Sequence, residues 1–210
     1  IAKKYNGTFK KLRTGFKYIG ELITELEKQG EASDFVMGFE ESYGYLAGTH
    51  ARDKDAVVAS MLICEMAAYY KSQGKTLIDV MNGLYDEFGY YCNTVQSYTF
   101  EGAAGMEKMA AIMDGLRDNK PSSFAGYEVT KIDDYKTSKS TIVKTGEESE
   151  ITLPKSNVLA YTLTNGNKVI VRPSGTEPKI KAYITAIGQS EENAKEIAQR
   201  LLNDANELMK

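Results

Sequence analysis

The hydrophobic pattern of residues 1–95 alternates between short strands and helices. Apolar residues recur every three to four positions over residues 17–29, which predicts an amphipathic helix that Gly30 ends. A possible strand at residues 8–12 precedes this helix, and a short apolar strand at residues 34–37 follows it. Strands that alternate with helices favour an α/β unit with mostly parallel strands.

Two further helices are expected in this half. Asp55 is a candidate N-cap for a helix that continues to about residue 71. Because this helix is apolar almost all round, we expect it to be buried. Thr76 and Asp79 resemble a capping box, with Asp in place of the usual Glu, and open another helix to about residue 88.

From about residue 96 the pattern favours an α+β domain with an antiparallel sheet. Asn165-Gly166 separates two apolar segments, which is a strong signal for a β-hairpin. A further strand is expected at residues 180–186, and helices at residues 105–117 and 191–209. We therefore predict a truncated α/β/α domain at residues 1–95 and a smaller α+β domain, its sheet packed on helices, at residues 96–210.

Composition narrows the function classes. The chain has 210 residues, 42% of them hydrophobic, and a net charge of −3 with a pI near 5.4. The chain has no excess of positive charge that would attract nucleic acid. An anionic ligand would therefore need a local binding site, which favours a small phosphorylated molecule over a polyanion. Cys64 and Cys92 are too few for a disulfide framework and predict reduced thiols in the cytoplasm. No segment approaches the ~18 consecutive apolar residues of a membrane span.

Residues 172–179, Arg-Pro-Ser-Gly-Thr-Glu-Pro-Lys, have the chemistry of a phosphate clamp. Arg172 offers a planar fork of donors, Ser174 and Thr176 add hydroxyls, and Gly175 lets backbone N–H groups approach an anion. Each charge-assisted bond contributes roughly 1.5–3 kcal/mol net. The alternative is a surface loop punctuated by Pro and Gly.

Residues 38–45, Gly-Phe-Glu-Glu-Ser-Tyr-Gly-Tyr, follow a predicted strand. Ligands of open α/β sheets bind at that edge, and carboxylates beside aromatic rings suit a sugar. An acidic loop that caps a helix explains this octapeptide equally well.

Cations follow within a dozen residues. Arg52 and Lys54 are placed to neutralise a phosphate, although Asp53 and Asp55 could instead pair with them as solvated charges. His50, the single histidine, is more often a surface residue than a catalyst in such a context.

Taken in order, the motifs resemble the α-D-phosphohexomutase family of phosphoglucomutases and phosphomannomutases. The stretches that carry the resemblance are Thr14–Lys17, Gly38–Gly44, Arg52–Asp55 and Arg172–Pro178. The resemblance covers nearly all of the chain and implies that residues 1–95 are most of the third of four domains, and residues 96–210 the fourth.

The resemblance also implies an isomerase. Such enzymes interconvert hexose 1-phosphate and hexose 6-phosphate through a phosphoserine and a bisphosphate intermediate, with Mg²⁺ and glucose 1,6-bisphosphate as cofactors. The phosphoserine loop and the Asp-x-Asp-x-Asp cluster for magnesium belong to the first two domains and do not occur in this sequence. We therefore expect the chain alone to be inactive.

Site residues carry over position by position. The resemblance implies that the substrate-binding residues are Thr14, Gly15, Lys17, Glu40, Ser42 and Arg52, and that the phosphate-binding residues are Arg172, Ser174, Gly175 and Thr176. Lys54 and His50 become candidates for proton transfer or charge stabilisation at the reacting oxygen. Arg13, where relatives tend to have an uncharged residue, departs from the pattern.

Two expectations concern the rest of the protein. The chain begins with Ile1, and we expect it to be part of a longer protein. A serine loop and an aspartate cluster upstream would indicate a mutase, and a natural start near residue 1 would indicate a non-catalytic phosphosugar-binding module. If the first strand of the third domain lies upstream, an unpaired sheet edge predicts a dimer through residues 1–95.

Overall fold

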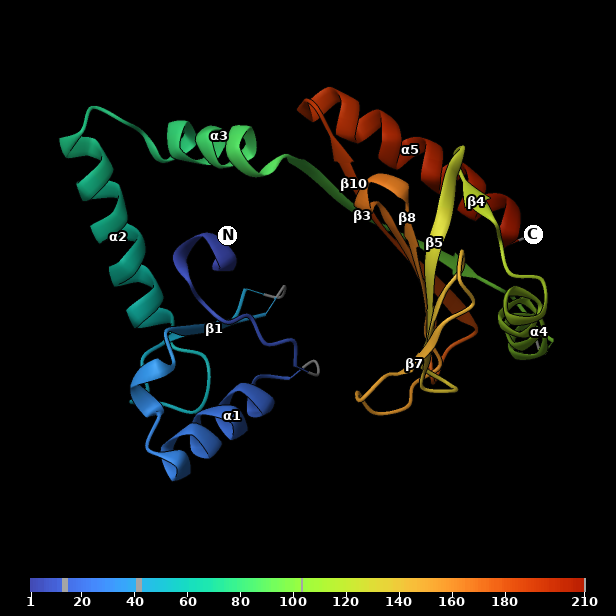
Figure 1. Cartoon of the computed structure of the whole chain (residues 1–210), viewed down its shortest axis with the longest axis horizontal. Helices are drawn as coiled ribbons and strands as arrows, with labels where there is room; N and C mark the ends of the chain where they lie inside the picture. Colours follow the sequence, from blue (N-terminus) through green and yellow to red (C-terminus); the bar gives the residue numbers. More distant parts are fainter. Residues whose placement is uncertain (13–14, 41–42, 103, 210) are drawn as a thin grey trace. The chain divides into compact units, whose positions relative to one another are not determined.

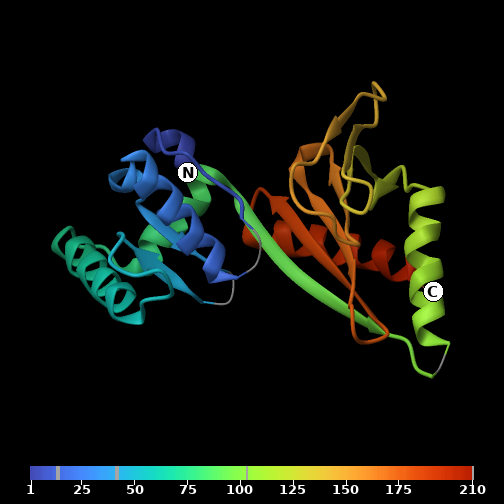
Figure 2. The ribbon, with the colours of Figure 1, turned by 90° about the horizontal axis from the view of Figure 1, so that it is seen from below.

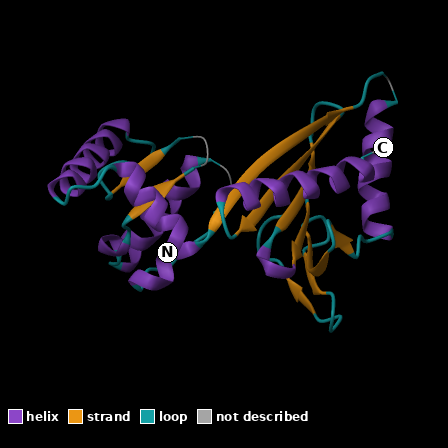
Figure 3. Cartoon of the chain, turned by 90° about the horizontal axis from the view of Figure 1, so that it is seen from above, coloured by secondary structure: helices purple, strands orange, loops and turns teal. Residues whose placement is uncertain are grey.

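The chain forms two compact units, Ile1–Leu84 and Tyr85–Lys210. The computed structural model describes residues 1–12, 15–40, 43–102 and 104–209. The first unit consists mainly of helices, and the second is built on a large sheet (Figures 1 and 3). An α/β domain followed by an α+β domain is the predicted fold class, and it is confirmed. The compact units divide the chain between Leu84 and Tyr85. The domain boundary predicted at residue 95 stays a prediction.

Among its described residues, the first unit holds three α-helices and a small hairpin. Its elements in chain order are the 3₁₀ helix η1 (Ala2–Tyr5), α1 (Phe16–Gln29), η2 (Ala32–Asp34), β1 (Met37–Phe39), β2 (Tyr45–Ala47), α2 (Ala56–Ser72) and α3 (Leu77–Phe88), of which α3 reaches into the second unit. Its small core consists of Phe16, Ile19, Ile23 and Leu46, so that α1 packs against the hairpin.

Local sequence signals set the helix ends of this unit as predicted. Asp55 caps α2 by accepting hydrogen bonds from the amides of Val57 and Val58. At the start of α3, Thr76 and Asp79 bond reciprocally, as a capping box requires. Gly30 ends α1 in the left-handed conformation, with a φ of 77°.

Four details of the first unit differ from the prediction. The strand expected at residues 34–37 lies instead at Met37–Phe39, after the 3₁₀ helix η2. Residues 8–12 form no strand, and β1 pairs with β2 antiparallel rather than parallel, because the chain turns back directly after Phe39. Helix α2 has no buried residue, although its sequence is apolar almost all round. Its packing is with β2, so this unit offers too few neighbours to enclose it.

Over residues 85–102 and 104–209, the second unit is an antiparallel sheet with two helices. Its strand order is β3-β10-β9-β8-β5-β6-β7, and β4 pairs with β5. The strands are β3 (Tyr90–Thr99), β4 (Ser123–Phe124), β5 (Tyr127–Asp134), β6 (Lys139–Ile142), β7 (Glu148–Glu150), β8 (Leu159–Leu163), β9 (Lys168–Pro173) and β10 (Lys179–Gly188), and the helices are α4 (Gly105–Asp118) and α5 (Glu191–Leu208). Helix α5 lies along β3 and β10 (Figure 2).

One face of this sheet forms the core. Alternate residues of β10, Ile180, Ala182, Ile184 and Ala186, are fully buried beneath α4 and α5, whose apolar residues Met113 and Leu201 belong to the same core. The residues between them on β10, such as Lys181 and Tyr183, are exposed on the opposite face. The sheet therefore has one buried and one open face.

The hairpin predicted at Asn165-Gly166 is confirmed. Strands β8 and β9 pair antiparallel, and Asn165 and Gly166 adopt positive φ angles of 65° and 86°. A short 3₁₀ turn, η3 (Thr164–Gly166), makes the connection. This hairpin fixes β9, and β9 ends at the loop of residues 174–178 that contains the predicted phosphate clamp.

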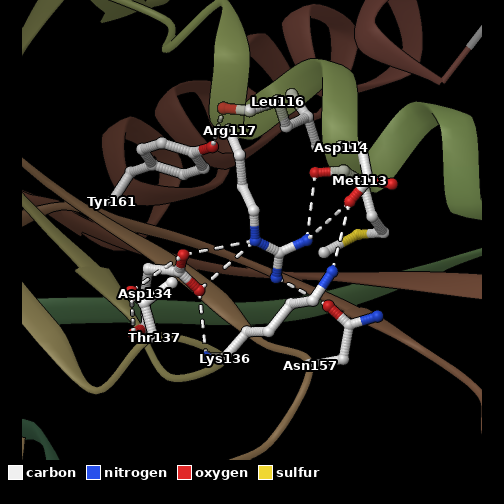
Figure 4. Close-up of polar contacts among 9 residues, drawn as sticks. All are labelled: Met113, Asp114, Leu116, Arg117, Asp134, Lys136, Thr137, Asn157 and Tyr161. Carbon is white, nitrogen blue, oxygen red and sulfur yellow. Dashed lines mark hydrogen bonds and ion pairs between the residues drawn. The ribbon is translucent and has the colours of Figure 1, made fainter.

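A partly buried polar cluster joins α4 to the sheet (Figure 4). The Arg117 guanidinium donates through Nε to Asp134 Oδ2 at 3.2 Å and through Nη2 to Asn157 Oδ1 at 2.6 Å. Tyr161 donates from its hydroxyl to the carbonyl of Leu116 at 3.3 Å. The cluster holds the end of β5 and the start of β8 against the last turn of α4. Across the described ranges, no helix has the length and apolar character that a membrane crossing needs.

Candidate functional site

Glu40 joins two of the predicted motifs. Its Oε1 accepts a hydrogen bond from the amide of Gly15 at 2.8 Å, directly before the first turn of α1. The amide of Glu40 donates to the carbonyl of Gly44 at 2.9 Å and closes the loop between β1 and β2. A carboxylate is favoured beside a helix N-terminus, where free N–H groups carry partial positive charge. The structure thus brings Gly15 and Glu40 together.

Lys54 reaches the same place from the segment that precedes α2. Its ammonium donates to Asp53 Oδ1 at 2.9 Å and lies 5.2 Å from the centre of the Phe16 ring. The hydrogen bond from its ammonium to Asp53 raises the pKa of Lys54 above its usual value, and the charge of Glu40 adds to the increase. Lys54 is therefore a cation at neutral pH, close enough to Glu40 to be influenced by the charge of its carboxylate.

His50 contacts the start of α2. Its Nε2 lies 2.7 Å from Asp55 Oδ2, while the other oxygen of Asp55 accepts from the first amides of the helix. The hydrogen bond with His50 lowers the pKa of Asp55, so this carboxylate stays ionised and orients the imidazole. A histidine held in this way can exchange a proton.

The side chain of Arg52 makes contacts that stabilise the fold. Its Nη2 lies 2.5 Å from Glu27 Oε1 in the last turn of α1, and its Nη1 donates to the carbonyls of Thr49 and Ala51. These contacts fasten the segment of residues 49–54 to α1. The described contacts give Arg52 a structural role, and its predicted role in substrate binding stays a prediction.

The other predicted residues of this unit divide into two groups. Lys17 is exposed on α1, with its ammonium 5.1 Å from the centre of the Tyr18 ring. Thr14 and Ser42 lie outside the described residues, as do Arg13 and Glu41. Of the predicted residues of this unit, Glu40, Gly15 and Lys54 make the described site.

In the second unit, the predicted phosphate clamp connects β9 to β10. Pro173 pairs with Ile180, and the amide of Ser174 donates to the carbonyl of Lys179 at 2.7 Å. The Ser174 hydroxyl accepts from the amides of Thr176 and Glu177 at 3.4 and 3.2 Å. Ser174 therefore shapes the loop through these hydrogen bonds.

Gly175 is exposed at the tip of this loop. Its φ is outside the left-handed region, and a Cβ added to it would meet no atom within 4 Å. The backbone and the packing therefore place no demand for glycine at this position. A ligand that must approach the backbone closely is one reason for having glycine there.

Lys181 is a functional candidate that the motif analysis missed. It is directly opposite Arg172 in the β9–β10 register, so both side chains lie on the open face of the sheet. Within the described part of the chain, neither side chain has a hydrogen-bond or ion-pair partner. Like charges directly opposite are destabilising, and a bound anion would offset their repulsion. The alternation Lys179-Ile180-Lys181 in the sequence predicts that Lys181 lies on the exposed face of a strand. Only the pairing register of β9 and β10 shows that Lys181 is opposite Arg172.

The described residues do not fit a resident metal ion. No group of three or more His, Cys, Asp or Glu side chains among them is arranged to hold a cation. No chemical step is therefore assigned to a metal bound by this chain.

Comparison with known proteins agrees with the motifs. The family model for "Phosphoglucomutase/phosphomannomutase, alpha/beta/alpha domain III" matches residues 1–88, and that for "Phosphoglucomutase/phosphomannomutase, C-terminal domain" matches residues 116–203. The chain belongs to the phosphoglucomutase/phosphomannomutase family. It carries two domains of a phosphohexomutase, in the order that the motifs predicted.

Staphylococcal phosphoglucomutases are similar to this phosphohexomutase chain. Those of Staphylococcus epidermidis and Staphylococcus aureus are 40% identical to it over 185 residues, which is 88% of this chain and 33% of each relative. That of Staphylococcus haemolyticus is 36% identical over 203 residues, which is 97% of this chain and 36% of the relative. The chain thus spans about a third of the length of these relatives.

A solved phosphoglucomutase structure has a similar fold. It is the open form of the exocytosis-sensitive phosphoprotein pp63/parafusin from Paramecium, with a TM-score of 0.59 and 20% identity. The match covers 93% of this chain and 32% of that structure. This likeness supports the fold of a phosphohexomutase.

Proposed function

We propose that this chain provides the sugar-binding and distal-phosphate-binding parts of an enzyme that interconverts hexose 1-phosphate and hexose 6-phosphate. The intact enzyme would transfer a phosphoryl group through a phosphoserine and a bisphosphate intermediate. Both the phosphoserine and the magnesium ligands would come from outside this chain. The chain alone is then expected to bind a hexose phosphate weakly and to turn over none.

The observation that supports this proposal is a pair of cations near the end of β9 and the start of β10, for which the described residues provide no hydrogen-bond or ion-pair partner. Arg172 and Lys181 face the same side of the sheet, on the two strands that flank the loop of residues 174–178. Arg172 suits phosphate oxygens through its planar fork, and Lys181 adds a point charge. The hydroxyls of Ser174 and Thr176 and the backbone at Gly175 complete a site for a phosphate that is held, not transferred.

A holding site of this kind fits the chemistry of a mutase. The substrate must bind in two opposite orientations, so that either phosphate reaches the transfer site in turn. One fixed phosphate grip and a sugar site tolerant of both orientations meet this need. We assign Glu40, together with Ser42, to the ring hydroxyls. Phosphoryl transfer depends chiefly on positioning and electrostatics, which these residues supply.

We assign charge stabilisation at the reacting oxygen to Lys54. Asp53 and Glu40 keep its ammonium protonated, so Lys54 acts as a cation that stabilises negative charge rather than as a base. His50, oriented by Asp55, is the second candidate and would take the proton of a substrate hydroxyl. Thr14, Gly15, Lys17 and Arg52 are proposed to line the substrate site.

Further proposals concern the intact protein. Mg²⁺ and glucose 1,6-bisphosphate would serve it as cofactor and intermediate, and a hexose phosphate substrate and reduced cysteines fit the cytoplasm. A dimer through residues 1–95 is also proposed, because the apolar side chains of α2, Met61 and Tyr69 among them, are exposed. Small-angle scattering tests the dimer, and a monomeric radius of gyration would contradict it.

The clamp is tested in the full-length protein with glucose 1-phosphate as substrate. Arg172→Ala is expected to lower kcat/KM by about 30- to 1,000-fold, or roughly 2–4 kcal/mol. Lys181→Ala should lose about tenfold, as one charge-assisted contact contributes about 1.5 kcal/mol or more. Lys144→Ala, an exposed lysine elsewhere in the second unit, is the matched control and should retain full activity. Unchanged rates for Arg172→Ala would remove the clamp. Turnover by the isolated chain would contradict the proposed division of labour.

A further inference from the structure

Gly44 is a buried glycine in the loop that connects β1 to β2, and it is enclosed between two side chains. A Cβ added to Gly44 would lie 2.6 Å from Cδ and 2.8 Å from Cγ of Lys54, and 3.3 Å from Cδ2 of Phe16. Contacts of a Cβ below 3.0 Å essentially do not occur in proteins. An alanine at position 44 would therefore have to displace the middle of the Lys54 side chain.

The backbone does not itself require glycine at position 44. Gly44 is absent from the described residues with positive φ, so alanine can adopt its backbone conformation. Its carbonyl accepts a hydrogen bond from Glu40, a contact that any residue can make. What glycine provides here is the space in which the stem of Lys54 lies.

This contact decides where the Lys54 ammonium is held. A lysine side chain loses rotamer freedom when it is fixed in one conformation, and the side chain of Lys54 is 52% exposed. Packing of its stem between Gly44 and the Phe16 ring, with Asp53 as hydrogen-bond partner, opposes that freedom. The backbone that leads to Lys54 also packs closely against α1 at Arg52, since a Cβ added to Gly20 would lie 2.6 Å from the carbonyl oxygen of Arg52.

We propose that Gly44 is a positioning residue of the reaction, which acts by giving the Lys54 side chain the path that holds its ammonium beside Glu40. This proposal rests on the function proposed for Lys54 at the reacting oxygen. The competing explanation is that Gly44 serves only the packing of the β1–β2 loop.

A double-mutant cycle in the full-length enzyme separates the two explanations. We expect Gly44→Ala to lower kcat for glucose 1-phosphate by about tenfold or more, and Lys54→Ala to lower it at least as much. In the Lys54→Ala background, Gly44→Ala should cost less than about twofold, since it then has no side chain to displace. Gly83→Ala, on α3 where an added Cβ meets no atom within 4 Å, is the matched control and should leave kcat unchanged. Equal losses from Gly44→Ala in both backgrounds, or no loss in either, would overturn the proposal.

A second measurement does not depend on turnover. In this chain, NMR titration of the Lys54 side chain should show its pKa falling toward the usual lysine value in Gly44→Ala, because the ammonium moves away from Asp53 and Glu40. Gly83→Ala should leave the titration unchanged. If Lys54→Ala retains full activity, the function proposed for Lys54 fails, yet this titration still tests the positioning. The same Lys54 pKa in Gly44→Ala and in the parent chain would overturn it.

Discussion

Gly175 is a glycine that the folded chain does not itself require, because it has open space around its Cα and no positive φ. We therefore expect Gly175→Ala to leave the free energy of unfolding within about 0.5 kcal/mol of the parent value. The same substitution should weaken glucose 1-phosphate binding by about tenfold, since the added methyl group occupies the approach to the loop. Denaturant unfolding and a binding titration measure the two effects.

Gly105 provides the matched contrast in the same unit. A Cβ at this position would lie 2.4 Å from the carbonyl oxygen of Phe100 and 3.0 Å from Cβ of Pro178. Gly105→Ala should therefore destabilise the fold by about 1–3 kcal/mol, the usual range for overpacking. If Gly175→Ala instead proved as destabilising as Gly105→Ala, glycine at position 175 would serve the fold and not a ligand.

At the scale of elements, Arg117 joins α4 to the sheet through a largely buried ion pair. The side chains of Arg117 and Asp134 are 13% and 17% exposed. Arg117→Met removes the charge but keeps an apolar stem, and it leaves Asp134 without its ion-pair partner, with only the Lys136 amide and the Thr137 hydroxyl still donating to it. We expect a loss of about 2–4 kcal/mol in the free energy of unfolding, because an unpaired buried charge is costly.

Asp114 is the control for this prediction. It contacts Arg117 and Lys136 from the surface of α4, and its side chain is 59% exposed. Exposed ion pairs contribute little, so Asp114→Ala should change the stability by less than about 0.5 kcal/mol. Equal effects of the two substitutions would show that burial does not set the strength of this cluster.

Tyr161 connects β8 to α4, and its hydroxyl makes part of the folding stability sensitive to alkaline pH. Burial raises the pKa of Tyr161 well above its usual value of about 10. The unfolded chain then loses this proton first, so the stabilisation is complete below about pH 10 and declines as the pH rises further. Tyr161→Phe should cost about 0.5–1.5 kcal/mol at neutral pH, through the hydrogen bond to Leu116, and should flatten this alkaline decline.

Urea unfolding at pH 8 and pH 10.5 measures both effects. Tyr183→Phe is the control, because Tyr183 is on the open face of the sheet and 36% exposed. A decline as steep in Tyr161→Phe as in the parent chain would contradict the assignment.

Helices were predictable from the sequence because their signals are local. The caps at Asp55, Thr76 and Gly30 and the apolar faces of α1 and α5 each lie within one segment. Strands depend on partners far along the chain, and this explains the misses. The hydrophobic pattern predicts no strand at β3, whose partner β10 is some 90 residues away, and none at the polar edge strands β6 and β7. The expected burial of α2 was wrong, because composition does not reveal which neighbours a helix has.

The candidate site was predictable to the same extent. Arg172 and Glu40 stand in compact motifs, and their order along the chain indicated the family. Lys181 was missed because its relation to Arg172 exists only in the register of β9 and β10. Two further contacts join separate elements and could not be predicted for the same reason. They are the ion pair of Arg52 with Glu27 and the close approach of the Lys54 side chain to Gly44.

At the scale of the whole molecule, the chain spans about a third of its phosphoglucomutase relatives and forms two compact units. The first unit presents Glu40 and Lys54, and the second presents Arg172 and Lys181. Neither set transfers a phosphoryl group by itself in the proposed mechanism. The account therefore predicts specific binding without chemistry for this chain.

The most direct test is an NMR titration of the ¹⁵N-labelled chain with glucose 1-phosphate. The account predicts saturable shifts centred on the amides of Ser174, Gly175 and Thr176 and on the side chains of Arg172 and Lys181. It predicts that these shifts disappear in Arg172→Ala and persist in Lys144→Ala. Shifts of equal size in Arg172→Ala, or a saturable response confined to residues away from this loop, would contradict it.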